Sequence, residues 1–136
     1  MYKIKIITVG KIKHQWLRLA INDYEQRLKK NITMNWVLFK DEKKWINYIE
    51  KEKTYFCLDQ KGKDVTSENF SDIIFKNKTI SIVIGSFIGI PEKIKKKAFL
   101  NIKLSSLTFT HQMTRLILLE QIYRSIEIFK ETKYHK

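Results

Sequence analysis

Apolar and polar positions along the chain follow two different periods, one typical of β-strands and one typical of α-helices. Residues Tyr2–Val9 begin as an alternation of apolar and polar positions and then become continuously apolar, with β-branched side chains in the majority. This pattern predicts a β-strand. Four further short apolar runs predict strands at Thr33–Phe39, Thr54–Leu58, Thr79–Ile84 and Leu100–Leu104.

The segments between these strands have helical spacing. Residues His14–Lys30 carry apolar side chains three and four positions apart, as in an amphipathic helix. Shorter helices are expected at Asp41–Lys53, from the N-cap Thr66 to about Phe75, and from Pro91 to about Phe99. Strands that alternate with helices predict an α/β fold with a mostly parallel sheet of five or six strands and helices on both faces. We expect residues 1–136 to form one domain.

The last helix differs from the others because it has no clean polar face. Ten of the nineteen residues from His111 to Phe129 are apolar: Met113, Leu116, Ile117, Leu118, Leu119, Ile122, Tyr123, Ile126, Ile128 and Phe129. A helix that is apolar most of the way round must be covered on more than one side. The protein's own sheet provides one cover, and we expect a second copy of the same helix to provide the other. The pattern therefore predicts a homodimer.

Composition narrows the class of protein. A hydrophobic content of 43% is typical of a globular chain and not of a disordered one. No apolar run is long enough for a transmembrane helix, and lysines interrupt the N-terminal segment, which therefore does not resemble a signal peptide. Cys57 is the only cysteine, so we expect no internal disulfide and no cysteine zinc site. These features favour the cytoplasm.

The net charge of +13 permits two interpretations. A basic surface of this size attracts polyanions such as nucleic acids. However, the chain is rich in Lys, Ile and Asn, and only four of its 27 basic residues are Arg. A genome that drifts towards A and T produces the same profile, so charge alone leaves nucleic-acid binding open.

Three loops are candidates for a ligand site because they follow apolar strands of the predicted sheet. In such sheets, ligands bind beyond the carboxyl ends of the strands. The usual nucleotide-binding, hydrolase and metalloprotease motifs are absent. The three histidines lie far apart in sequence, so we do not expect them to bind a metal. On their pattern alone, ordinary strand-to-helix turns are the favoured interpretation of these loops. They are Asp59–Lys63, Gly85–Ile90 and Ser105–Thr110.

Several polar residues of the last quarter also have two interpretations. Glu120 and Arg124 are spaced to form a surface ion pair, but the surrounding helix is predicted to be buried, and a buried Arg requires a partner or a function. His111 is placed to bond nearby backbone at a helix start. Tyr134 and His135 would ordinarily belong to a frayed tail.

Three segments of the chain resemble one family closely. They are "KIKIITVGKIK" at the start, "CLDQKGK" in the middle, and "FTHQMTRLILLEQIYRSIEI" followed by the terminal "YHK". These segments are similar to the SPOUT-class methyltransferases of bacterial type, which modify large-subunit (23S) ribosomal RNA at N3 of a pseudouridine. The resemblance covers almost the whole chain, and its last motif is long and specific.

The resemblance implies a trefoil-knotted α/β domain whose C-terminal segment threads through a loop. It also implies a homodimer with the last helices at the interface, S-adenosylmethionine as methyl donor, and RNA of an assembled ribosome as substrate. No metal or membrane partner is implied. The donor-binding positions that carry over are Leu58, Gly85, Leu104, Ser105, Ser106, Leu107, Thr108 and Phe109. They lie in the three loops already selected or directly before them.

Catalytic roles follow from the same resemblance. His135, from the tail of the partner subunit, is expected to position the substrate or to handle the N3 proton, because histidine titrates near neutral pH. Arg124 is expected to orient the base or its backbone through its planar guanidinium. Tyr134 is grouped with them as a member of the same terminal motif.

The sequence departs from the family pattern at several positions. Ser86 and Ile88 replace a glycine and a polar residue in the glycine-rich loop, Thr110 replaces a proline, and Glu131 and Lys133 replace a glycine and a proline near the end. A serine is tolerated at a glycine position only if its φ is negative. The chain is also shortened between about Lys40 and Lys53. We therefore keep two alternatives: a non-catalytic basic protein that binds RNA or the ribosome, and a SPOUT enzyme with another RNA target.

Overall fold

A computed structural model describes all 136 residues and contains one five-stranded sheet. The strand order is β2-β1-β4-β3-β5, and every pairing is parallel. The strands are β1 (Tyr2–Val9), β2 (Ile32–Phe39), β3 (Phe56–Asp64), β4 (Thr79–Ile84) and β5 (Leu100–Lys103). The helices are α1 (Gln15–Leu28), α2 (Glu42–Glu50), α3 (Ser67–Lys76), α4 (Glu92–Lys97) and α5 (His111–Phe129). The predicted α/β fold is confirmed, with five strands and not six.

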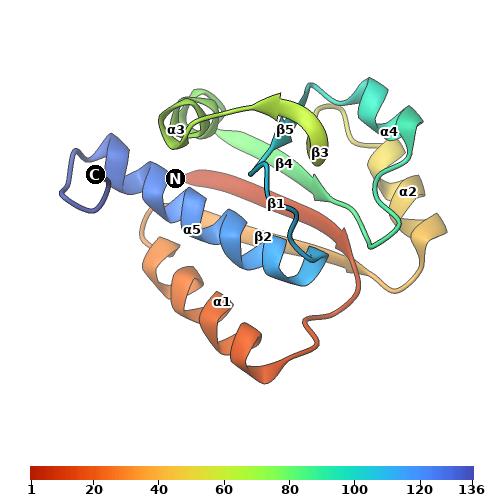
Figure 1. The fold of residues 1–136 in the computed structure, drawn as a ribbon, viewed down its shortest axis with the longest axis horizontal. Helices are drawn as coiled ribbons and strands as arrows, with labels where there is room; N and C mark the ends of the chain where they lie inside the picture. Colours follow the sequence, from red (N-terminus) through yellow and green to blue (C-terminus); the bar gives the residue numbers. More distant parts are fainter.

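Helices cover both faces of the sheet, as predicted (Figure 1). Alternate residues of the buried strands point to opposite faces, so Ile6 of β1 contributes to one apolar core and Ile7 to the other. The larger core lies between the sheet and α1, α3 and α5, and the smaller one lies under α2 and α4. A sheet that is buried on both faces explains why its strands read as continuous apolar runs.

Strand β3 differs from its prediction because it does not end at Leu58. The register between β3 and β5 shifts, so that Leu58 and Lys63 both pair with Ile102. Between these two pairings the chain crosses the backbone of β5. A Cβ atom added to Gly62 would lie only 2.8 Å from backbone atoms of Asn101 and Ile102. The segment 59–62, predicted as a simple turn, is therefore an arch over β5, and the strong curvature of β3 is visible in Figure 1.

Helix α5 lies against the sheet between α1 and α3, and its start and end are both fixed by local bonds. Thr110 is the N-cap, and its hydroxyl accepts a hydrogen bond from the backbone N–H of Met113 at 3.2 Å. After the last turn, Glu131 has a left-handed φ of 58°, and the backbone N–H of Thr132 donates to the carbonyl of Glu127 at 3.0 Å. The chain therefore reverses direction and returns along α5.

The predicted start of α3 is confirmed, including its cap. Thr66 and Asn69 form a capping box in which each side chain bonds the other's backbone. Helix α4 is shorter than expected, and Pro91 precedes its first residue. No helix has the length and apolar character required to span a bilayer.

The arch predicts that Gly62→Ala destabilises the fold. The new Cβ would meet strand backbone, which cannot rotate away as a flexible side chain can, so we expect a loss of about 1–3 kcal/mol. Equilibrium unfolding in urea measures this loss. Lys61→Ala, an exposed change one residue away, is the control and should alter stability by less than about 0.5 kcal/mol. Equal effects of the two variants would contradict the close crossing.

Candidate functional site

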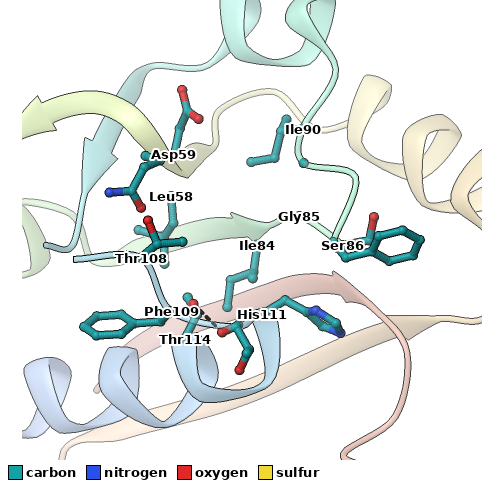
Figure 2. A pocket seen from close by; sticks show the side chains of 14 residues that line it. Leu58, Asp59, Ile84, Gly85, Ser86, Ile90, Thr108, Phe109, His111 and Thr114 are labelled. Atoms are coloured by element: carbon teal, nitrogen blue, oxygen red, sulfur yellow. Dashed lines mark hydrogen bonds between the residues drawn. The ribbon is translucent and has the colours of Figure 1, made fainter. Parts of the chain in front are cut away.

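A cavity of about 650 Å³ opens where β3 and β4 stop pairing, after Leu58 and Ile84 (Figure 2). Three segments that are distant in sequence surround it: the middle of β3, the loop after β4, and the connection from β5 into the first turn of α5. This is the edge of the sheet at which the sequence predicted a ligand site. The lining residues are Leu58, Asp59, Gln60, Ile84, Gly85, Ser86, Phe87, Gly89, Ile90, Thr108, Phe109, Thr110, His111 and Thr114.

Seven of the eight predicted donor-binding residues line this cavity or a smaller one beside it. The main cavity is lined by Leu58, Gly85, Thr108 and Phe109, and the smaller one by Leu58, Leu104, Ser105, Leu107 and Phe109. Ser106 lines neither cavity. The side-chain amide of Gln60 donates to the carbonyl oxygens of Ser105 at 3.1 Å and of Ser106 at 3.5 Å. The arch thus holds the 105–106 segment in place beside the cavity.

The glycine-rich loop after β4 is closely packed upon itself. A Cβ on Gly85 would lie 2.9 Å from the carbonyl carbon of Gly89 and from the Ile90 side chain. Ser86 closes a turn, because its carbonyl accepts from the N–H of Gly89 at 2.9 Å and its hydroxyl accepts from the N–H of Ile88 at 3.2 Å. Glu131 is the only non-glycine residue with a positive φ, so Ser86 is free of strain at its glycine position.

The first turn of α5 contributes residues that the sequence did not identify as part of the cavity. His111 and Thr114 both line it, and the Thr114 hydroxyl donates to the Thr110 carbonyl at 2.9 Å (Figure 2). Burial, together with the nearby positive charges of Arg115 and Lys13, lowers the pKa of His111 below its ordinary value of 6.5. The sequence "THQ" at the start of α5 was the only signal that could have pointed to these residues. Helical periodicity shows which residues share a face of a helix, but it does not show which loops that face contacts.

Two side chains of α5 tie this turn to the connection between β1 and α1. Arg115 is fully buried, and its Nη2 donates to the carbonyls of Val9 and Gly10, each at 2.9 Å. Gln112 accepts from the N–H of Lys13 and donates to the carbonyl of Lys11. No carboxylate pairs with Arg115, and burial lowers its pKa. The position of His111 therefore depends on bonds to the first strand of the chain.

The three predicted catalytic residues form a separate cluster near the other end of α5. The Tyr134 hydroxyl donates to Glu120 at 3.0 Å, and its ring packs edge-on against Tyr123 with centroids 5.0 Å apart. Arg124 makes an ion pair with Glu120 at 3.1 Å and contacts His135. The tail is thus docked on its own subunit, and the predicted Glu120–Arg124 pair is half-buried and more extensive than a surface pair.

The structure does not bring the tail cluster and the cavity together within one chain. Thr114 lines the cavity, whereas Arg124 lies ten residues further along α5, a rise of about 15 Å. In Figure 1, the C-terminus lies at the left end of α5, and the loop after β4 lies beyond the opposite end. No group of three or more His, Cys, Asp or Glu side chains is arranged to hold a metal ion.

Comparison with known proteins gives consistent matches over the whole chain. The family described as "Predicted SPOUT methyltransferase" matches residues 2–135. The protein named "Ribosomal RNA large subunit methyltransferase H" from Protochlamydia amoebophila is 44% identical, with 100% of both chains covered. Proteins of the same name from Clostridium botulinum and Prochlorococcus marinus are 38% and 39% identical, with 98% of this chain and 99% and 96% of theirs covered.

One solved structure also shares the fold. It is titled "The structure of a probable methylase family protein from Haemophilus influenzae Rd KW20" and has a TM-score of 0.54 and 10% sequence identity. The alignment covers 99% of this chain and 70% of that one. At this identity the likeness concerns the fold alone.

The environment of His111 predicts a pH effect on stability. Because its folded pKa lies below the unfolded value, its contribution is present above about pH 6.5 and is lost as the pH falls through the folded pKa. We expect His111→Asn to lose less unfolding free energy than the natural chain between about pH 7.5 and pH 5.5. Urea unfolding at both pH values measures this difference. An equal loss in both proteins would show that the histidine is not held neutral.

Proposed function

Because the chain belongs to the SPOUT methyltransferase family, we propose that it transfers the methyl group of S-adenosylmethionine to N3 of a pseudouridine in 23S ribosomal RNA. The observation that carries this proposal is the full-length match to relatives named as large-subunit ribosomal RNA methyltransferases. Membership in the family implies the trefoil knot that the resemblance predicted, and the close approach of the β3 arch to the backbone of β5 is consistent with it.

The main cavity fits the proposed donor in size and chemistry. A volume of about 650 Å³ lies within the range of small-molecule sites. The apolar side chains of Leu58, Ile84 and Ile90 suit an adenine ring, and the threonine hydroxyls and loop amides suit the ribose and the amino-acid group. When bound, the donor supplies a methyl group on a sulfonium. The protein's part is to hold that group in line with the acceptor nitrogen, which is a matter of orientation.

The net charge of +13 supports an RNA substrate, because lysines and arginines neutralise backbone phosphates. An assembled ribosome as substrate would place the protein in the cytoplasm. The N3 proton must leave the base during methylation, and His135 is the proposed acceptor. Arg124 would orient the base or a phosphate through its guanidinium, and Tyr134 would hold the tail in position.

The outward face of α5 supports a homodimer. The helix buries Leu118 and Ile122 against the sheet, and its opposite stripe begins with the half-buried apolar residues Met113 and Ile117. On α1, which packs against α5, the first turns expose Trp16 and Leu19 at 56% and 61%. Exposed apolar side chains on two neighbouring helices are typical of a protein interface. A two-fold axis would let this surface pair with itself.

An antiparallel arrangement of the two α5 helices would also complete the active site. Within one chain, about 15 Å of helix separates the cavity from the tail cluster. Pairing the start of one α5 with the end of the other would place the tail cluster of each subunit beside the cavity of its partner. The proposed site therefore consists of the donor pocket of one subunit and His135, Arg124 and Tyr134 of the other.

The test of the function is a comparison of ribosomal RNA with and without the protein. Mass spectrometry of 23S RNA from cells that lack the gene should show loss of one methyl group at a pseudouridine, and the purified protein with S-adenosylmethionine should restore it. Unchanged RNA, together with no heat on titration of the donor in calorimetry, would favour the non-catalytic binder. A missing methyl group at another nucleotide would identify a SPOUT enzyme with a different target.

Mixed dimers test whether two chains share each site. Gly85→Ala should abolish donor binding, because the added Cβ displaces the loop, whereas His135→Ala should lower kcat by about 10²-fold and leave donor affinity unchanged. In a dimer with one variant of each kind, one of the two sites keeps an intact pocket and an intact tail. Random reassociation should therefore recover about a quarter of the wild-type activity.

Two controls complete this experiment. Each variant reassociated with itself should remain inactive, and calorimetry should confirm that His135→Ala binds the donor normally. If both the pocket and the tail of a site came from one chain, every site in the mixed dimer would carry one defect and no activity would return. Loss of donor binding in His135→Ala would instead show that this residue belongs to the donor pocket.

A further inference from the structure

We propose that Glu68, at the start of α3, is a positioning residue for His135 that holds its imidazole in one tautomer and one orientation. This inference rests on the proposed function, because it concerns the residue that would accept the N3 proton. Neither the family resemblance nor the cavity pointed to Glu68. It comes from a helix that lies next to α5 and takes no part in the donor pocket.

The His135 ring has a polar partner on each nitrogen. Its Nε2 lies 3.2 Å from Oε2 of Glu68, and its Nδ1 lies 3.1 Å from Nη1 of Arg124. The His135 side chain is 23% exposed, so water has limited access to the ring. Two opposed contacts at hydrogen-bond distance leave the imidazole little freedom to rotate or flip.

The identity of the two partners determines where the proton of the neutral ring resides. A guanidinium has only N–H donors and stays protonated, so Nδ1 must accept from Arg124. A carboxylate can only accept, so Nε2 must carry the hydrogen and donate it to Glu68. Glu68 and Arg124 together therefore select the Nε2–H tautomer, and the lone pair of His135 is on Nδ1.

The remaining contacts show that this arrangement is built into the tail. Glu120 holds Arg124 through the ion pair at 3.1 Å and also accepts from the Tyr134 hydroxyl at 3.0 Å. The guanidinium of Arg124 lies over the Tyr134 ring, 5.0 Å from its centroid. Apart from Glu68 and Arg124, no charged or titratable side chain makes a hydrogen bond or ion pair with the His135 ring. Both ring partners thus come from helices, and Arg124 is itself fixed.

This geometry defines how His135 would accept a proton. The Nδ1 lone pair becomes available when Arg124 exchanges its bond to the ring for a bond to the nucleotide. The N3–H bond of the base then breaks, its proton forms a bond to Nδ1, and the N3 electron pair attacks the methyl carbon. The electron pair of the breaking C–S bond remains on the sulfur. The resulting imidazolium is stabilised by the carboxylate of Glu68, which keeps its own charge throughout.

Glu68 has a second possible role that a test must separate from this one. It lies in the first turn of α3, where an acidic residue stabilises a helix, and its side chain also accepts from its own backbone N–H. That hydrogen bond, and then the one from His135, lower the pKa of Glu68. Glu68→Asp retains a negative charge at the helix start but is one methylene shorter, so it should lose the contact with the ring.

The first measurement is nitrogen NMR of the His135 ring in the natural dimer and in Glu68→Gln. The natural protein should show the hydrogen on Nε2. Arg124 still donates to Nδ1 in the variant, so the hydrogen should stay on Nε2, but a neutral amide is a weaker acceptor than a carboxylate and should shift the Nε2 resonance and broaden it as the ring gains freedom. The control is Asp72→Asn, which removes one negative charge from an exposed position of the same helix and should leave the spectrum unchanged. An Nε2 resonance that Glu68→Gln leaves unchanged would overturn the proposal.

The second measurement is the methyl-transfer rate. Glu68→Gln and Glu68→Asp should each lower kcat about tenfold, less than the loss of a general base itself, while KM for the donor is unchanged. Asp72→Asn should retain full activity. Normal kcat in Glu68→Asp would show that Glu68 only stabilises α3. If the natural protein does not methylate RNA, the proposed function fails, but the NMR experiment still decides whether Glu68 positions His135.

Discussion

The close crossing of the β3 arch over β5 is the constraint on which the rest of the structure depends. Without a side chain, Gly62 lets two backbone segments approach to a distance that any Cβ would prevent. The crossing directs the chain that leaves β5 past the ends of β3 and β4. The segment from Leu104 to Thr110 is therefore brought beside Gly85 and Leu58, although more than forty residues separate it from Leu58. The cavity is therefore formed by loops that lie beside this close crossing.

Helix α5 connects the cavity with the C-terminal tail, and both of its ends are held in fixed positions. Its first turn is fixed by Arg115, a buried cation that bonds only backbone carbonyls, and its last turns hold Tyr134 and His135 through Glu120 and Arg124. Burying a guanidinium without a carboxylate is costly. This cost indicates that the bonds of Arg115 are needed to hold the start of α5 against the end of β1. A rigid helix with a functional group at each end, too far apart to meet, is suited to a site shared between two copies.

Much of the fold could be predicted from the sequence, because strands and helices are encoded by local periodicity. The cap at Thr66, the strand Thr79–Ile84 and the helix His111–Phe129 all follow from neighbouring residues. The arch could not be predicted in this way, since "DQKG" has the composition of a turn and its close contact with β5 is long-range. The family resemblance selected the loops that line the cavity, but it did not include His111 in the cavity or connect Glu68 with His135. Both depend on packing between elements that are separate in sequence.

The departures from the family pattern can be judged by what each position requires of its residue. Gly85 needs the absence of a Cβ because of the backbone of Gly89, and Gly89 needs a positive φ of 94°. Ser86 needs neither, and its hydroxyl adds a bond inside the turn. Glu131 is different, because it adopts the left-handed φ of 58° that a glycine would take without strain. The backbone strain from this substitution therefore lies in the turn at Glu131, where the chain reverses direction and the tail docks on α5. The glycine-rich loop beside the cavity keeps its shape.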